Sequence, residues 1–151
     1  MYLYDSGERT YKEAKAFCKL KGATPLMIRD EEKQKMIENL FRNSSIWLAL
    51  EKKNRERPEI TKFDWETPIL YEGATLMHHD YQNWAPDQHN KTEKCVIMRN
   101  TNTTGMEMEW IQFPCDSNAS VVCEKKNTGN KLALLSTSLA HQKILVKQND
   151  G

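Results

Sequence analysis

The chain has 151 residues and a formal net charge of +1, from 22 Lys+Arg against 21 Asp+Glu. This length suits one domain with its own core, and a 38% hydrophobic content is typical of a globular rather than a disordered chain. The near-neutral charge excludes an electrostatic argument for a nucleic-acid partner. No apolar run approaches the length of a membrane-spanning helix, so we expect no direct membrane insertion of this chain.

The first predicted helix covers residues 10–21. Thr10 and Glu13 have the spacing of a capping box, in which each residue bonds the other's backbone, and Gly22 favours an end to the helix. The expected buried face is formed by Tyr11, Ala14, Phe17 and Cys18.

A second helix is predicted over residues 31–41. Asp30 is a suitable N-cap, and the acidic first turn suits the positive end of the helix dipole. The expected apolar stripe consists of Met36, Ile37, Leu40 and Phe41.

Short apolar runs after the helices predict strands, whereas residues 66–94 show little periodicity and indicate a long loop region. Long ordered loops in compact domains are commonly functional. Two helices followed by short strands indicate an α+β fold. The predicted strands are residues 46–50, 95–98, 107–111 and 121–124.

The cysteines and glycosylation sequons both favour an extracellular or lumenal protein. Four cysteines without a CxxC pair disfavour structural zinc and suit two disulfides, although spacing leaves three pairings open. The cysteines are Cys18, Cys95, Cys115 and Cys123. The predicted N-glycosylation sites are Asn43, Asn90, Asn102 and Asn118.

The first residues contain charges and no apolar stretch of signal-peptide length, so this chain carries no recognisable signal peptide. We therefore expect a fragment of a larger secreted protein or the ectodomain of a membrane receptor. Composition also changes near residue 126. Residues 125–151 contain five Lys, one Asp and no aromatic residue. We predict a domain over residues 1–125 and a basic, flexible or weakly helical tail over residues 126–151.

A series of motifs follows in order along the chain: Thr10-Tyr-Lys-Glu-Ala-Lys-Ala-Phe-Cys18, Trp47-Leu-Ala-Leu50, Asn83-Trp-Ala-Pro86, Cys95-Val96, Glu109-Trp-Ile111, Cys115 and Val122-Cys-Glu-Lys125. Together they resemble the C-type lectin-like domain in its short, four-cysteine form, over roughly residues 2–125. The resemblance implies a double-loop fold with two helices flanking small antiparallel sheets. It also implies the disulfides Cys18–Cys123 and Cys95–Cys115.

In sugar-binding members of that family, loop oxygens hold a calcium ion that also binds sugar hydroxyls. The resemblance assigns four positions of this chain to that calcium site: Gln88, Asn90, Glu93 and Gln112. Three of the four are neutral amides, whereas calcium favours six to eight oxygens with several carboxylates. His89 replaces the family's cis-proline, and cis peptides are costly before other residues. We therefore expect no cofactor and no bound metal, with calcium as the alternative.

These observations predict an extracellular recognition module that binds a protein or glycan through the 66–112 surface without calcium. The alternative is a calcium-dependent carbohydrate-binding lectin with an atypical site. The expected ligand contacts are Tyr81, Trp84, Asp87, Gln88, His89, Asn90 and Glu93. For the tryptophans, including Trp84, core packing is the competing interpretation.

Two other classes of function are compatible with single features of the sequence. An enzyme or metal site would use His78, His79 and His89, but no catalytic motif accompanies them and we predict no enzyme. A structural role would make the chain one unit of a larger parent protein or of a non-covalent oligomer, because the four cysteines are used internally.

Overall fold

The computed structural model describes residues 1–53, 62–66, 75–88, 91–101, 107–125 and 147–148. It contains two helices, α1 (Tyr11–Leu20) and α2 (Glu31–Phe41), and a set of short strands. The strands are β1 (Tyr2–Arg9), β2 (Thr24–Pro25), β3 (Ile46–Lys53), β4 (Lys62–Trp65), β5 (Cys95–Asn100), β6 (Met108–Phe113), β7 (Ala119–Glu124) and β8 (Lys147–Gln148). The predicted α+β fold is confirmed.

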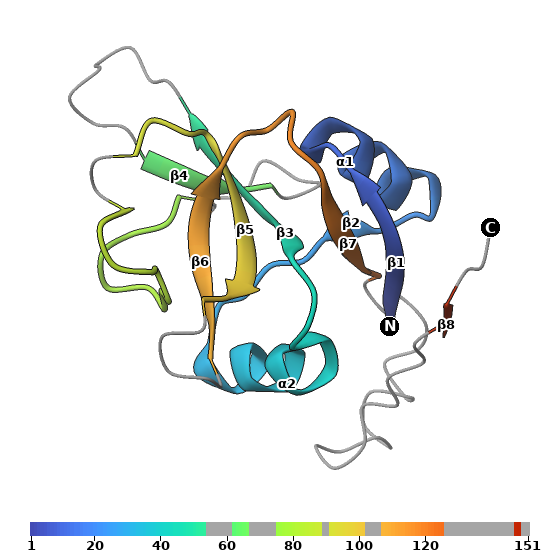
Figure 1. Ribbon diagram of the computed structural model, residues 1–151, viewed down its shortest axis with the longest axis horizontal. Coiled ribbons are helices and arrows are strands. Elements are labelled where there is room, and N and C mark those ends of the chain that lie inside the picture. The colour runs from blue at the N-terminus through green and yellow to red at the C-terminus, as the bar shows by residue number, and fades with distance from the viewer. Residues whose placement is uncertain (54–61, 67–74, 89–90, 102–106, 126–146, 149–151) are drawn as a thin grey trace.

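The strands form two groups of mainly antiparallel ladders (Figure 1). One group pairs β6 with β5, β5 with β3, and β3 with β4. The other pairs β1 and β2 with β7, and β8 lies parallel to β1. A single parallel pair, Ile46 with Ser120, joins β3 to β7 and so connects the two groups.

Both predicted helix starts are confirmed by their caps. The hydroxyl of Thr10 accepts from the Glu13 N–H at 3.3 Å, and the Thr10 N–H donates to the Glu13 carboxylate at 2.9 Å. Asp30 accepts from the Lys33 N–H at 2.7 Å at the start of α2. Gly22 ends α1 at a φ of +66°, a left-handed conformation that glycine adopts without steric cost.

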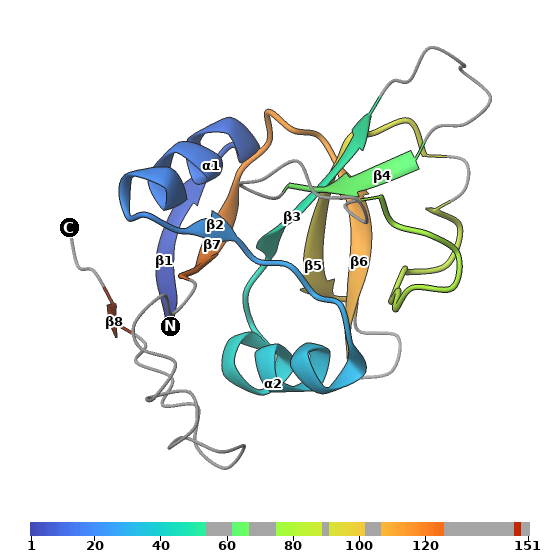
Figure 2. The same cartoon turned by 180° about the vertical axis from the view of Figure 1, so that it is seen from behind.

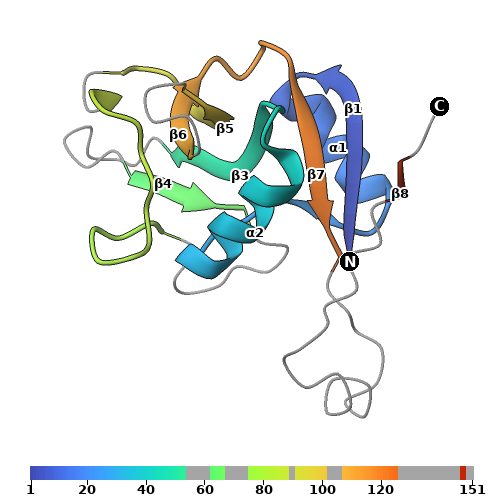
Figure 3. The same ribbon diagram turned by 60° about the horizontal axis from the view of Figure 1, so that its bottom comes forward.

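The apolar stripe expected on α2 is partly wrong. Ile37 and Phe41 are buried, but Leu40 is 40% exposed, and two polar residues lie on the buried face in its place. These are Gln34 at 2% exposure and Glu38 at 9%. Figure 3 shows α2 between β4 and β7. Its two buried polar residues bond the backbone of Met108 at the start of β6.

The buried residues form two clusters on either side of β3. One fills the space between α2 and the β3–β5–β6 strands, and the other lies under α1 against β3, β5 and β7. In the view from behind, the segment from β2 to α2 crosses the back of β3, where the Ala49 N–H donates to the Leu26 carbonyl at 2.8 Å (Figure 2).

Two disulfides join the elements, Cys18–Cys123 and Cys95–Cys115, the same pairs that the resemblance implies. The first links α1 to β7, and the second links the start of β5 to the turn after β6. No free cysteine remains in the chain. Of the expected tail, only residues 147–148 are described, as strand β8, and the rest lies outside the described residues.

Candidate functional site

The described part of the long loop comprises residues 75–88 and 91–94, which we call the long-loop surface. It lies along the edge of the sheet beyond β6, where Trp84 forms a parallel bridge with Trp110 (Figure 1). Two backbone bonds fix this bridge, from the Trp110 N–H to the Asn83 carbonyl at 2.8 Å and from the Ala85 N–H to the Trp110 carbonyl at 2.9 Å. The loop therefore continues the sheet.

Aromatic contacts anchor the middle of the long-loop surface. The Trp84 ring lies 5.6 Å from that of Trp110 and 5.0 Å from that of Phe63, and the indole N–H of Trp84 donates to Gln82 at 2.8 Å. Trp84 is half-buried, and Trp47, Trp65 and Trp110 are buried. Core packing therefore accounts for the three buried tryptophans, and Trp84 is a support for the loop.

Tyr81 is half-buried beside the core tryptophan Trp110, with ring centroids 6.0 Å apart. Burial, followed by the negative charges of Glu38, Glu31, Glu107 and Asp30, raises the pKa of Tyr81 to about 12. Its phenol therefore remains protonated at neutral pH and is available as a hydrogen-bond donor at the surface.

Gln88 and Gln112 form a reciprocal pair at the end of the described loop. The Gln112 N–H donates to the Gln88 side-chain oxygen at 2.8 Å, and the Gln112 amide donates to the Gln88 carbonyl at 2.6 Å. Gln88 is 9% exposed and Gln112 is 8% exposed. Two hydrogen bonds between buried amides thus fasten the loop to β6, and the side-chain oxygen of Gln88 faces the protein rather than solvent.

Asp87 precedes this pair and is exposed. Its φ of +63° lies in the left-handed region, which is uncommon for a residue other than glycine and which aspartate tolerates better than most. The carboxylate is therefore presented on a turn whose next residue is fixed to β6. Glu93 is half-buried two residues before Cys95.

The remaining sequence-predicted contacts, His89 and Asn90, lie outside the described residues, as do the sequon asparagines Asn90 and Asn102. His78 and His79 are exposed, with ring centroids 5.4 Å apart. Within the described parts of the chain, no group of three or more His, Cys, Asp or Glu residues could hold a metal ion.

The calcium site implied by the resemblance can be tested on these residues. The Gln112 side-chain oxygen is buried and has no hydrogen-bond partner among the described residues, as expected of an atom that could ligate a cation. The Gln88 oxygen, in contrast, is already used by the Gln112 N–H. Glu93 is then the one carboxylate among the described members of that site. A donor set with one carboxylate, and with the Gln88 oxygen already bonded to the protein, does not fit an ion that requires several carboxylates.

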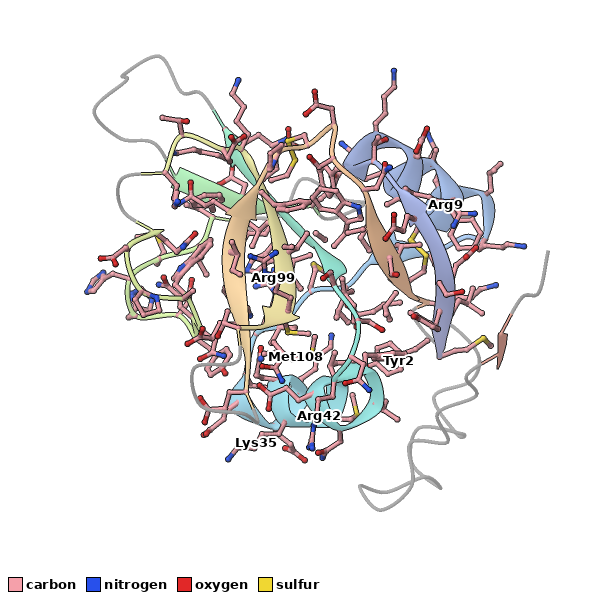
Figure 4. All side chains as sticks on the ribbon, viewed as in Figure 1. Tyr2, Arg9, Lys35, Arg42, Arg99 and Met108 are labelled. Carbon is pink, nitrogen blue, oxygen red and sulfur yellow. A yellow bond between two sulfur atoms is a disulfide. The ribbon has the colours of Figure 1, made fainter. Side chains whose placement is uncertain are left out.

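A buried polar network supports the loop from below, and sequence reasoning missed it. The Gln34 amide donates to the Met108 carbonyl at 2.7 Å and to Glu38 at 2.8 Å, and the Trp110 indole N–H donates to Gln34 at 3.0 Å. Asn83 donates to the same Met108 carbonyl at 2.9 Å. Figure 4 shows Met108 at the end of β6 that faces α2.

Comparisons with known proteins agree with this fold. The family model of the lectin C-type domain matches residues 7–125. The versican core proteins of Bos taurus and Homo sapiens are 29% identical over 128 residues, which is 82% of this chain and 3% of each of those proteins. The chain thus spans a small part of the length of these relatives.

Solved structures are similar throughout the domain. A mouse scavenger receptor C-type lectin carbohydrate-recognition domain has a TM-score of 0.65 at 23% identity, covering 85% of this chain and 90% of that one. The C-type lectin domain of murine dendritic cell inhibitory receptor 2, in complex with N-glycan, has a TM-score of 0.63 at 21% identity, with 83% and 90% covered. A calcium-independent type II antifreeze protein has a TM-score of 0.59 at 20% identity, with 81% and 82% covered.

At these identities the structures establish the fold and leave the ligand open. The family match covers most of the chain, and its span includes α1, α2, both disulfides and the long-loop surface. The chain belongs to the C-type lectin domain family.

Proposed function

We propose that the chain is an extracellular recognition module that binds a protein or a glycan through its long-loop surface without calcium. The bonding between Gln88 and Gln112 carries this proposal, because the Gln88 side-chain oxygen, which the resemblance assigns to the ion, already accepts from the Gln112 N–H. A loop fastened in this way is ordered before a ligand arrives, so binding costs less conformational entropy.

The chemistry of the long-loop surface suits a polar ligand. Asp87 presents an exposed carboxylate, Tyr81 a protonated phenol, and Glu93 a half-buried carboxylate. His89 and Asn90 remain predicted contacts. This set offers acceptors and a donor to hydroxyl, amide or cationic groups, and its aromatic members can pack on an apolar face of a sugar or peptide.

Calcium should leave the stability of the chain unchanged. At millimolar calcium we expect no change in melting temperature, because the available oxygens include too few carboxylates to offset the dehydration of the ion. Differential scanning calorimetry with calcium and with EDTA measures this. Magnesium at equal concentration controls for ionic strength. A rise of several degrees with calcium, lost in Glu93→Ala, would contradict the proposal.

A ligand screen tests the function itself. Glycan and protein arrays are probed with the whole chain in calcium and again in EDTA, and we expect any captured ligand to be retained in EDTA. Asp87→Ala should weaken that binding on the order of tenfold, about 1.4 kcal/mol, because it removes a presented acceptor. Asp116→Ala, an exposed acid in the turn after β6, is the matched control and should bind normally. Binding abolished by EDTA would overturn the calcium-independent assignment.

A calcium-dependent lectin with an atypical site is the second candidate. The buried oxygen of Gln112 is the observation that favours it, since no described residue bonds this atom and a nearby cation would satisfy it. For this candidate the same calorimetric and array experiments have the opposite expected outcome, so one series of measurements separates the two.

The cellular location and assembly of the chain are part of the same proposal. We place the chain outside the cell, in a secreted protein or a receptor ectodomain, on the basis of its disulfides and its four sequons. No catalysis is proposed. In the part of the chain that the structure describes, neither helix has the length and apolar character needed to cross a membrane. Assembly into a larger parent protein or a non-covalent oligomer is the accompanying expectation.

A further inference from the structure

A polar groove of about 290 Å³ lies between β5 and β1, across the junction of the two strand groups. Its walls come from β1, from the segment that follows α2, from β5 and from the start of β7. Arg99, an exposed cation on β5, stands at this groove (Figure 4). The Ser44 hydroxyl, which bonds the Tyr4 hydroxyl at 3.1 Å, lines its opposite side.

Two of the four sequons meet at this groove. Asn43 and Asn118 both line it, and both are exposed. The hydroxyl residues of the two sequons, Ser45 and Ser120, line it as well, and the Ser120 N–H donates to the Ser45 carbonyl at 2.9 Å. Because this junction is parallel, the asparagines two positions earlier in each sequon lie at the same end of it.

The groove also has the composition of a sugar-binding surface. The half-buried ring of Phe113 contributes an apolar contact, while the serines, asparagines and Arg99 contribute donors and acceptors. An N-acetylglucosamine residue has an apolar ring face, hydroxyls and an acetamide, which match these two kinds of contact.

Gln88 of the long-loop surface lies on the face of β6 opposite to the groove. Phe113 lines the groove, and its neighbour Gln112 bonds Gln88 of the long loop. Consecutive residues of a strand point to opposite faces, so bulky groups in the groove leave the long-loop surface open.

We propose that Asn43 and Asn118 form a paired N-glycosylation site whose two glycans seat their first sugars in this groove and cover this face. The donor is a polyprenyl-diphosphate-linked oligosaccharide. The asparagine Nδ2 forms a bond to C1 of the first N-acetylglucosamine while the bond from C1 to the diphosphate oxygen breaks. The polyprenyl diphosphate leaves with the electron pair of that bond, and the proton released from Nδ2 balances the negative charge that the diphosphate gains. The inference rests on the extracellular residence proposed above. It identifies the face with the groove as the one that the glycans cover.

The test uses the 151-residue chain, secreted from eukaryotic cells behind a heterologous leader. The chain is deglycosylated enzymatically in water enriched in oxygen-18, which converts each occupied asparagine to labelled aspartate. Peptide mass spectrometry then reports occupancy at each sequon. Arginine labelling of the native protein with phenylglyoxal then reports access to Arg99. In the double variant Ser45→Ala with Ser120→Ala, which removes both sequons and keeps both asparagines, Arg99 should react at least roughly threefold faster because the bulky glycans are gone.

Two controls accompany that variant. Ser45→Thr with Ser120→Thr preserves both sequons and should keep Arg99 shielded. Arg29, exposed ahead of α2 and not among the groove residues, should react equally in every variant. If the serine substitutions prevent folding, Asn43→Gln with Asn118→Gln serves the same purpose.

The outcomes separate this inference from the proposed function. Occupancy of Asn43 and Asn118 with a shielded Arg99 supports the paired site. Occupancy of Asn102 without Asn43 or Asn118 overturns it and leaves extracellular residence intact. Occupied sites with an equally reactive Arg99 overturn the seating of the glycans in the groove, and no occupancy at any sequon counts against both proposals.

Discussion

Replacing Cys18 and Cys123 together by alanine is expected to lower the free energy of unfolding by about 4–5 kcal/mol. The disulfide joins residues 105 apart in sequence, so its loss releases a large conformational entropy in the unfolded chain. Both cysteines are fully buried in the cluster under α1, where alanine leaves a small void in addition. Urea denaturation followed by tryptophan fluorescence measures the change.

The second disulfide supplies the matched comparison. Cys95 and Cys115 are only 20 residues apart, so their double alanine variant should lose roughly 3 kcal/mol in the same loop-closure treatment. A larger loss for this shorter loop would show that loop length does not determine the contribution of the two disulfides.

Replacing Gln34 by leucine is expected to destabilise the domain by about 2–4 kcal/mol, although the two side chains are similar in volume. The Trp110 indole N–H would lose its acceptor, and Glu38 would lose the amide that donates to it. The Met108 carbonyl would keep its bond from Asn83. Thermal and urea unfolding give the size of the effect, and the Trp110 fluorescence reports the changed surroundings of the indole.

Asn39→Leu is the control for this experiment. Asn39 is an exposed amide on the same helix, and leucine favours a helix more than asparagine does, so its free energy of unfolding should stay within about 0.5 kcal/mol of the original. Equal effects of the two substitutions would mean that the buried bonds of Gln34 contribute no stability.

Local signals in the sequence predicted the parts of the fold that depend on neighbouring residues. The cap of α1 depends on Thr10 and Glu13, three positions apart, and both bonds form as expected. The burial of Gln34 depends on Met98, Met108 and Trp110, which are 64, 74 and 76 positions away. Apolar periodicity therefore predicts that Leu40 lies in the core. The structure instead buries Gln34 and Glu38 on α2 and leaves Leu40 exposed.

Strand β1 was also absent from the sequence prediction, for a similar reason. Residues 2–9 carry charges and a glycine, and they form a strand because they pair with the buried strand β7. The candidate site was predicted through the family resemblance, which placed Gln88 and Gln112 in one ligand set. The two amide side chains point toward each other because the loop packs on β6. No pattern of neighbouring residues in the sequence indicates this arrangement.

The contact between Met1 and Lys125 has a mechanical consequence. The Lys125 N–H donates to the Met1 carbonyl at 2.9 Å, and Leu3 stands opposite Cys123 in the β1–β7 ladder. Tension applied between Met1 and Lys125 therefore separates the residue pairs of the β1–β7 ladder one after another. The Cys18–Cys123 bond then carries the force. Only the 17 links before Cys18 and the two after Cys123 can extend, roughly 65 Å in total. Both the long-loop surface and the groove asparagines lie inside the closed loop, so this load does not pass through either of them.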